Sequence, residues 1–442
     1  MTKLIVDFSE IKGKIKPIHS VNNGPVGGTW GVGNIELFKE AGIPYARNHD
    51  ASFASAYGGE HAVDVSNIFP DFDADETKEE NYDFVLTDVT VKKCMEAGTK
   101  VFYRLGQKIE HAIKKYGVNP PEDFKKWAVI CEHIIRHYTE GWADGFDAGI
   151  EYWEIWNEHD NGEPDKNPCW TGTMEQFHDF YEIAAKHLKE KFPHLKIGGP
   201  AMVGSTPSYK KSEIFIEDMA KRNVPMDFFS YHFYTTSAHG MSWTANYTRA
   251  LLDKYGYKDT EVILDEWNYC TGWDREKITH SYETIRSLRG AAYVSACQID
   301  AQKSPIDMFM YYDARPGTAF NGMFELGTLK PMKPYYSFFA FNELYKLGSE
   351  TKSESDDNDV YVLSAKGDKK AVLISYYGGV EAEDKVIEIH LSGFEKPNSK
   401  ITYKILNNEF NLETTKEEYV NGSAVTLYNK MEANSVMLLT IE

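Results

Sequence analysis

Two glutamates follow apolar runs that have the composition of buried strands. Glu158 comes after the run 150–156, and Glu266 ends the run 261–266. If both runs are parallel strands, their carboxyl ends meet at one edge, where a barrel carries its active site. A convergent pair of carboxylates suits hydrolysis of a glycosidic bond. One acts as a neutral acid, and the other, ionised, attacks the anomeric carbon or activates water.

Neighbouring acidic residues compete with this pair for the catalytic roles. Asp265 directly precedes Glu266. Side chains alternate along a strand, so we expect Asp265 and Glu266 to point to opposite sides and only one to face Glu158. The strand-end position favours Glu266. Glu154 faces away from the apolar side chains beside it, and we predict a charge inside the barrel that takes no catalytic role.

Short apolar runs alternate with amphipathic stretches from about residue 14 to 345, which predicts a parallel sheet covered by helices. The length suits a (β/α)8 barrel. The rival is an open doubly wound sheet, for which we would expect a glycine-rich nucleotide loop that the sequence lacks. The predicted strands are 44–48, 100–105, 150–156, 196–199, 228–232, 261–266 and 308–312. The predicted helices are 34–41, 122–138, 174–192, 210–222 and 280–303.

The distance between the two glutamates fits one barrel. Glu266 follows Glu158 by 108 residues, and two predicted strands lie between their strands. Three βα units of about 36 residues each therefore separate them, close to the roughly 30 residues of a typical unit. If Glu158 follows strand four, Glu266 ends strand seven, and both face the barrel mouth.

The segment Trp156-Asn157-Glu158 on strand four and Glu266 on strand seven resemble the retaining glycoside hydrolases of clan A. Within that clan the chain looks most like family 39, the β-xylosidase and α-L-iduronidase group. The resemblance implies that Glu158 is the general acid/base and Glu266 the nucleophile. It also implies that Asn157 binds the 2-hydroxyl of the sugar, and that Arg47, ending strand two, keeps Glu266 ionised.

The clan also places a histidine and a tyrosine after strand six, which His232 and Tyr234 match. In many clan members, strand eight ends with a tryptophan whose ring forms the floor of the sugar site. Tyr312 stands in that part of this sequence, so a tyrosine replaces the tryptophan or the floor comes from elsewhere.

Further residues are predicted to line the pocket because they follow the predicted strands. His49 and Asp50 follow Arg47, separated from it by Asn48, and Trp267 follows Glu266. Tryptophan rings offer flat apolar faces for sugars, although packing is the commoner role of such a ring. Tryptophans in or next to predicted βα loops are Trp30, Trp170, Trp243, Trp267 and Trp273.

The sequence changes character after residue 347. A polar, turn-rich segment covers 348–359, and alternating runs follow at 360–365, 371–377, 386–391, 401–405, 424–428 and 435–441. This pattern predicts a C-terminal antiparallel β-sandwich. We therefore expect a catalytic barrel at 13–347 and a sandwich domain at 348–442, joined by an N-terminal strand at 2–12.

Composition and motif content limit the kinds of partner that the protein is expected to bind. The 442 residues carry a net charge of −19, which repels phosphate backbones, so no nucleic acid is expected. No apolar run reaches membrane-spanning length, so no membrane partner is expected. Five scattered cysteines and no H-E-x-x-H pattern argue against a zinc or disulfide framework, and we expect neither metal nor cofactor. The N-terminus lacks a signal-peptide core, which favours the cytoplasm, with a processed secreted form left open.

The prediction is a retaining, exo-acting glycoside hydrolase that is β-xylosidase-like and takes a carbohydrate substrate. The long stretches 51–81 and 160–172 could wall the cleft and so favour exo action. Alternatives are an α-L-arabinofuranosidase, another clan A glycosidase acting on a uronide, glucoside or galactoside, a transglycosylase, or a non-catalytic carbohydrate-binding protein. The resemblance also allows a homo-oligomer.

Overall fold

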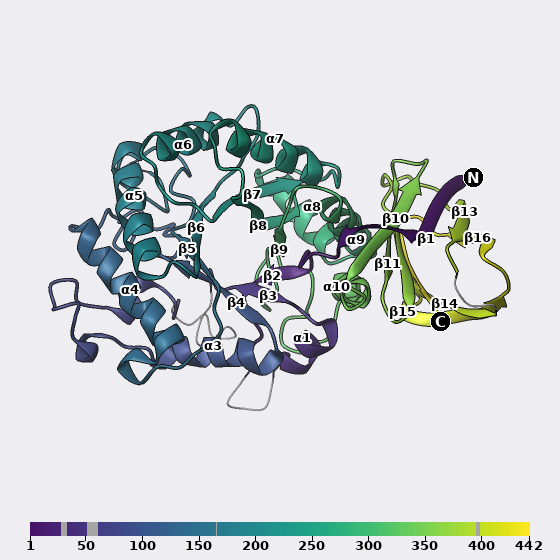
Figure 1. The fold of residues 1–442 in the computed structure, drawn as a ribbon, viewed down its shortest axis with the longest axis horizontal. Coiled ribbons are helices and arrows are strands. Elements are labelled where there is room, and N and C mark those ends of the chain that lie inside the picture. Colours follow the sequence, from purple (N-terminus) through teal and green to yellow (C-terminus); the bar gives the residue numbers. More distant parts are fainter. Residues whose placement is uncertain (28–32, 51–60, 165, 395–397) are drawn as a thin grey trace.

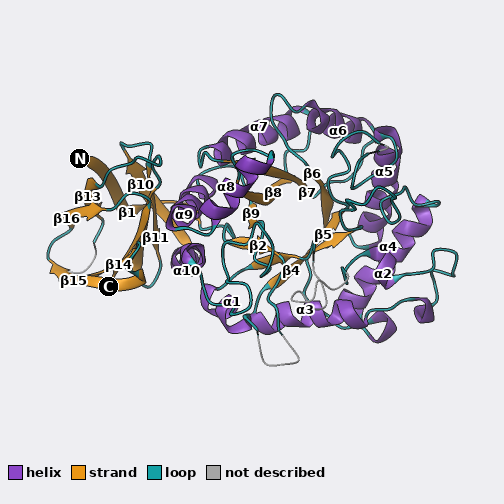
Figure 2. Cartoon of the chain, turned by 180° about the vertical axis from the view of Figure 1, so that it is seen from behind, coloured by secondary structure: helices purple, strands orange, loops and turns teal. Residues whose placement is uncertain are grey.

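The computed structural model describes residues 1–27, 33–50, 61–164, 166–394 and 398–442. Eight parallel strands close into a barrel inside a ring of helices (Figures 1 and 2), which confirms the predicted fold class. Trp30 and residues 51–60 of the predicted wall lie outside the described residues. The barrel strands are β2 (Ser20–Asn22), β3 (Tyr45–Arg47), β4 (Lys100–Leu105), β5 (Tyr152–Ile155), β6 (Lys196–Met202), β7 (Phe228–Thr235), β8 (Glu261–Tyr269) and β9 (Met308–Tyr311).

In barrel order β5 is strand four and β8 is strand seven, as the residue count predicts. The helices are α1 (Ile35–Ala41), α2 (Val65–Ile68), α3 (Val85–Ala97), α4 (Phe124–Glu140), α5 (Met174–Lys191), α6 (Lys210–Lys221), α7 (Gly240–Lys254), α8 (Arg275–Ile285), α9 (Leu288–Gln302) and α10 (Lys333–Tyr345), with short 3-10 turns at Glu79–Asn81 and Trp142–Asp144. No helix in the described part of the chain is long and apolar enough to cross a membrane.

The predicted helix 280–303 is two helices. α8 ends at Ile285, and α9 begins after Ser287, whose hydroxyl accepts a hydrogen bond from the backbone N–H of Gly290. A serine in that position satisfies one of the free N–H groups of the first helical turn and so starts a new helix.

A second sheet packs beside the barrel against α9 and α10 (Figure 1). It has nine strands, in the order β15-β14-β17-β12-β11-β10-β1-β13-β16, and all pairs are antiparallel except β1 with β13. Its two halves enclose one apolar core, to which Leu4, Val6 and Phe8 contribute. The strands are β1 (Thr2–Lys14), β10 (Ser349–Ser355), β11 (Val360–Lys366), β12 (Lys370–Tyr376), β13 (Lys385–Ser392), β14 (Ser399–Leu406), β15 (Asn411–Val420), β16 (Ala424–Met431) and β17 (Ser435–Ile441).

β10 lies within the segment that the sequence pattern assigns to turns. The inward positions of this strand are Thr351 and Ser353, both buried. The hydroxyl of Thr351 is 2.6 Å from that of Ser364 on β11, and Ser353 donates to the carbonyl of Val362. Hydroxyl pairs replace apolar contacts on this strand, so no hydrophobic alternation marks it in the sequence.

The barrel interior has an apolar layer, formed by Phe102, Tyr152, Phe228, Ile263, Met308 and Met310. Tyr152, Phe228 and Met308 open their strands, on the side away from the mouth. Polar and charged side chains follow them toward the carboxyl ends, among them Arg47 and Glu154, both wholly buried. The barrel is therefore a packed core whose upper layer is charged.

Candidate active site

Glu158 lies just beyond the end of β5. Its backbone has a φ of 47°, and that of Trp156 a φ of 74°, both in the left-handed region that such residues seldom adopt. The Glu158 N–H donates to the carbonyl of Ala201, 2.9 Å away, which fixes this turn to the next strand. Strain of this kind collects at functional sites, where the surrounding structure holds it in place.

Two side chains hold the carboxyl group of Glu158. Nδ1 of His232 is 2.8 Å from one oxygen, and the side-chain amide of Asn161 donates to the other at 2.7 Å. The thiol of Cys169 is 3.9 Å from that second oxygen. Asn161 and Cys169 belong to the segment 160–172 that follows Glu158. This segment therefore covers one side of the carboxyl group.

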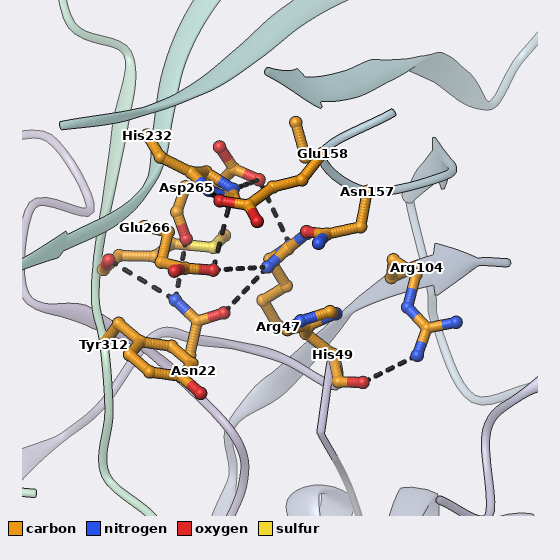
Figure 3. A network of polar contacts seen from close by, with 12 residues as sticks. Asn22, Arg47, His49, Arg104, Asn157, Glu158, His232, Asp265, Glu266 and Tyr312 are labelled. Atoms are coloured by element: carbon orange, nitrogen blue, oxygen red, sulfur yellow. Dashed lines mark hydrogen bonds and ion pairs between the residues drawn. The ribbon is translucent and has the colours of Figure 1, made fainter. Parts of the chain in front are cut away.

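Glu266 on β8 faces Glu158 across the barrel mouth (Figure 3). The Tyr234 hydroxyl donates to its Oε1 at 2.6 Å, and its Oε2 lies 3.5 Å from Arg47 Nη1 and 3.6 Å from His232 Nε2. One carboxylate oxygen of Glu158 and one of Glu266 lie within 4.8 Å of each other. Burial and the Glu158 charge raise the pKa of Glu266 to about 7, against the opposite effects of His232, Arg47 and Tyr234.

The expected alternation of Asp265 and Glu266 does not hold. Tyr231 and His232 of β7 pair with Leu264 and Glu266 of β8, so β8 carries one extra residue at this point. The register against β9 shifts over the same residues. This β-bulge turns both carboxyl groups toward the barrel interior.

Arg47 connects the groups of the site (Figure 3). Its Nε donates to Glu154 at 2.7 Å, its Nη1 to the Asn22 side-chain oxygen at 3.1 Å, and its Nη2 to the Asn157 side-chain oxygen at 2.7 Å. Although burial opposes it, the carboxylates of Glu154, Asp265 and Glu266 raise the pKa of Arg47. The guanidinium is therefore a permanent positive charge beneath both glutamates.

His232 lies between the two glutamates and is buried. Burial alone would lower its pKa, but the Glu266 and Asp265 carboxylates outweigh that effect and raise the pKa of His232 well above its usual value. The imidazole is therefore charged at neutral pH, with one N–H toward Glu158 and the other toward Asp265 and Glu266.

His49, Asp50 and Tyr312 form a second group of polar side chains at the barrel mouth. The Tyr312 hydroxyl donates to Asp50 at 2.8 Å, and Arg315 lies 3.7 Å from the same carboxyl group. Burial would raise the pKa of Asp50, but His49, Arg315 and His61 together hold it below its usual range. Both ring nitrogens of His49 are buried without a hydrogen-bond partner among the described residues. Such free polar atoms suit a ligand rich in hydroxyl groups.

The tryptophans differ in their surroundings. Trp267, assigned to the substrate site from the sequence, lies wholly buried in the core, where its ring stacks on Phe309 at a centroid distance of 4.1 Å. Trp170 is also buried, whereas Trp243 and Trp273 are 51% and 67% exposed. Trp273 contacts the ring of Tyr234 and so lies nearest to the glutamates among these exposed rings.

Asn22, whose amide the sequence assigns equally to hydroxyl binding or to a turn, ends β2 and donates to the backbone carbonyl of Asp265 at 2.7 Å. Other residues of the site were not found by the sequence analysis. Ser230 donates to Glu154 at 2.7 Å, and Asn161 and Arg315 hold site carboxyl groups. Ser230 stands within a barrel strand, which is the signal that could have identified it.

The arrangement is two carboxyl groups that face each other, a charged histidine between them and a buried guanidinium below. One ligand atom from each of Glu158, His232 and Glu266 lies within 4.8 Å of the others, and this trio could hold a metal ion. The adjacent Arg47 charge would oppose a cation there. The geometry suits acid and nucleophilic catalysis by the side chains themselves.

Comparisons with known proteins agree with this chemistry. The family model described as glycosyl hydrolases family 39 matches residues 61–380. A β-xylosidase of Geobacillus stearothermophilus is 26% identical over 272 residues, which cover 53% of this chain and 49% of that protein. A β-xylosidase of Caldicellulosiruptor saccharolyticus is 24% identical over 322 residues, 66% of this chain and 63% of that one. The match thus spans half to under two thirds of these relatives.

Among solved structures, a glucosidase from Croceicoccus marinus is similar over the whole chain. Its TM-score is 0.81 at 21% sequence identity, and the alignment covers 100% of this chain and 99% of that chain. At this identity the likeness concerns the fold, namely a barrel with an attached β-sheet domain.

Proposed function

The chain belongs to family 39 of the glycosyl hydrolases, and from this premise we propose that it is a retaining, exo-acting, β-xylosidase-like glycosidase. It is a glycoside hydrolase that acts on a carbohydrate substrate. The proposal adds three points: the anomeric configuration is retained, the enzyme removes a terminal sugar, and that sugar is xylose.

The observation that carries the retaining mechanism is the short distance between the two carboxyl groups. Oxygens of Glu158 and Glu266 lie within 4.8 Å of each other. Retaining glycosidases hold their carboxyl groups about 5–5.5 Å apart, whereas inverting enzymes need about 6.5–9.5 Å to admit a water molecule. The shorter spacing supports direct attack by one carboxylate on the anomeric carbon.

We assign Glu266 as nucleophile because its environment orients it. Tyr234 binds Oε1, so Oε2 is the oxygen left to attack, and Arg47 and His232 favour its ionised form. Glu158 is assigned as acid/base. It protonates the leaving oxygen in the first step and deprotonates the attacking water in the second.

The proposed substrate contacts come from the side chains around this pair. Arg47 donates to the side-chain oxygen of Asn157, and the amide nitrogen of Asn157 is buried without a hydrogen-bond partner among the described residues. A 2-hydroxyl of the bound sugar would accept from it. His49, Asp50 and Tyr312 would bind the hydroxyl groups farther from the anomeric carbon. The chemistry uses side chains and water and requires no cofactor.

The two β-xylosidase relatives support xylose as the sugar, and the covering of Glu158 by the segment 160–172 supports a closed pocket and exo action. The similarity to a glucosidase favours a β-glucoside as the second candidate. A panel of aryl glycosides of xylose, glucose, arabinofuranose, galactose and uronic acids separates these, since one sugar should give the highest kcat/KM. Product analysis with an added sugar acceptor measures any transglycosylation.

Two experiments test the mechanism. Proton NMR of the first-formed product should show the anomeric configuration of the substrate, and a slowly turned over 2-fluoro glycoside should leave a covalent adduct on Glu266. An inverted product would refute the retaining assignment. An adduct mapped by mass spectrometry to Asp265, Asp50 or Glu158 would show that the nucleophile is another residue. No turnover of any glycoside, with sugar binding intact, would favour a non-catalytic carbohydrate-binding protein.

A further inference from the structure

Beneath the two proposed catalytic glutamates lies a second pair of carboxyl groups, Glu154 on β5 and Asp265 in the bulge of β8. Both are wholly buried. Both face the same nitrogen of Arg47, since Nε lies 2.7 Å from Glu154 Oε2 and 3.1 Å from Asp265 Oδ2. A single N–H cannot satisfy two carboxylates, so these two groups must share their partner or hold a proton between them.

The charges of this buried layer also do not balance if every acid is ionised. Glu154, Glu158, Asp265 and Glu266 would contribute four negative charges, while Arg47 and His232 contribute two positive ones. All six residues are less than a tenth exposed. An uncompensated buried charge is costly, and such sites take up protons instead. The catalytic acid accounts for one proton, and a second is still needed.

Hydrogen bonding indicates where that second proton lies. Both oxygens of Asp265 are buried without a well-aligned hydrogen bond among the described residues, and the nearest donors, Arg47 Nε and His232 Nε2, lie 3.1 Å and 3.6 Å from Oδ2. Glu154, by contrast, is fixed on both sides. The Ala201 N–H donates to the Ser230 hydroxyl, which donates to Glu154 Oε1, and Arg47 Nε donates to Oε2. A proton on Glu154 would give Asp265 an aligned hydrogen bond in addition to these two nearby charges.

We propose that Glu154 and Asp265 share one proton at neutral pH, so that the pair carries a single negative charge and Glu154 is a positioning residue that acts through Arg47. This inference rests on the proposed role of Glu266. With one charge in the pair rather than two, the Arg47 guanidinium stays available to hold Glu266 ionised.

The groups that face Glu154 from other elements are consistent with this arrangement. They are Arg47 from β3, Asp265 from β8, Ser230 from β7 and Tyr181 from α5. Burial, together with the Asp265 carboxylate, raises the pKa of Glu154 to about 8 against the opposite effect of Arg47. Burial would raise the pKa of Asp265 too, but Arg47 and His232 hold it below its usual value. The proton therefore resides mainly on Glu154.

The test is a double-mutant cycle with E154Q, D265N and the double variant, read from the pH profile of kcat/KM on an aryl glycoside. If one proton is shared, either single variant leaves one negative charge, because the remaining acid ionises. The acid limb should then stay within about half a pH unit of wild type. The double variant removes the last charge, and its acid limb should move to lower pH by roughly one to three units.

A single variant that moves the acid limb about half as far as the double variant would overturn the proposal, because both acids would then be ionised in the wild type. A single variant that moves it as far as the double variant would also overturn it, because the remaining acid would then stay protonated and take over no charge. Either single variant tests this point if the other does not fold. Infrared difference spectra of wild type minus E154Q at pH 7 give a readout independent of activity. A protonated-carboxyl carbonyl band is expected, and a carboxylate band alone would refute the shared proton. This measurement holds even if the protein cleaves no glycoside.

Discussion

Tyr234→Phe removes one hydroxyl group from the partner of the proposed nucleophile and leaves the ring. The hydroxyl donates to Glu266 Oε1 at 2.6 Å, and Tyr234 lies within the aromatic group of Trp273 and Phe320. Burial, together with Glu266, raises the pKa of Tyr234 well above its usual value, so the hydroxyl remains a donor over the whole working range. The bond stabilises the ionised form of Glu266, and its loss must raise the pKa of that group.

The size of the effect follows from the hydrogen bond. A bond to a charged group contributes about 1.5–3 kcal/mol, and 1.36 kcal/mol corresponds to one pKa unit. The pKa of Glu266, about 7 in the wild type, should therefore rise by roughly one to two units in Tyr234→Phe. At pH values well below 7, the ionised fraction of Glu266 in Tyr234→Phe, and with it kcat/KM, should be about ten- to a hundredfold lower than in the wild type.

The assay is the pH profile of kcat/KM for an activated aryl glycoside, on which acid catalysis matters least. The acid limb should move to higher pH, and the deficit of the variant should shrink as the pH rises. Tyr312→Phe is the matched control. It removes a nearby hydroxyl that donates to Asp50 instead of Glu266, so its acid limb should stay in place. An unmoved limb in Tyr234→Phe would refute the reasoning.

Three further predictions address other parts of the structure. Glu158→Ala should slow glycosides with poor leaving groups far more than activated ones, and an equal loss on both would argue against its role as acid. Trp267→Phe should lower the free energy of unfolding by about 1–3 kcal/mol in a denaturant titration and leave KM unchanged. A large rise in KM would show that the ring contacts the substrate. Leu4→Ala, in the core of the nine-stranded sheet, should cost about 2–5 kcal/mol while kcat at 25 °C is retained. Loss of kcat in a folded Leu4→Ala protein would show that this sheet acts on the site.

Much of the barrel could be predicted because its strands are buried on both faces. Such strands are near-continuous apolar runs, and β4, β5 and β8 appear in the sequence as such. Parallel strands in a barrel end at one face, so the count of βα units was enough to bring Glu158 and Glu266 together. The strand-end position of Arg47 follows from the same rule, whereas β7 continues past His232 to Thr235.

The bulge at Asp265 could not be predicted from the sequence. One extra residue in a strand changes which side every later residue faces, and no local pattern marks where the extra residue lies. Both the alternation argument for Asp265 and the assignment of Trp267 depend on that register. β10 was missed for a different reason, because Thr351 and Ser353 fill its inner face with hydroxyl groups.

The buried charge that equips the site for catalysis should also lower the stability of the fold, and Glu266→Gln tests this. The pKa of Glu266 is about 7 in the folded protein, compared with an ordinary value of 4.5. An acid whose pKa is raised by folding favours the folded state only while it is protonated, so stability is lost as pH rises from about 4.5 through 7. The difference corresponds to at most about 3.4 kcal/mol. Glutamine carries no charge at any pH, so Glu266→Gln should melt a few degrees above the wild type at pH 8 and close to it at pH 5. A variant that melts below the wild type by the same amount at both pH values would show that the charge of Glu266 is fully compensated by Arg47 and His232.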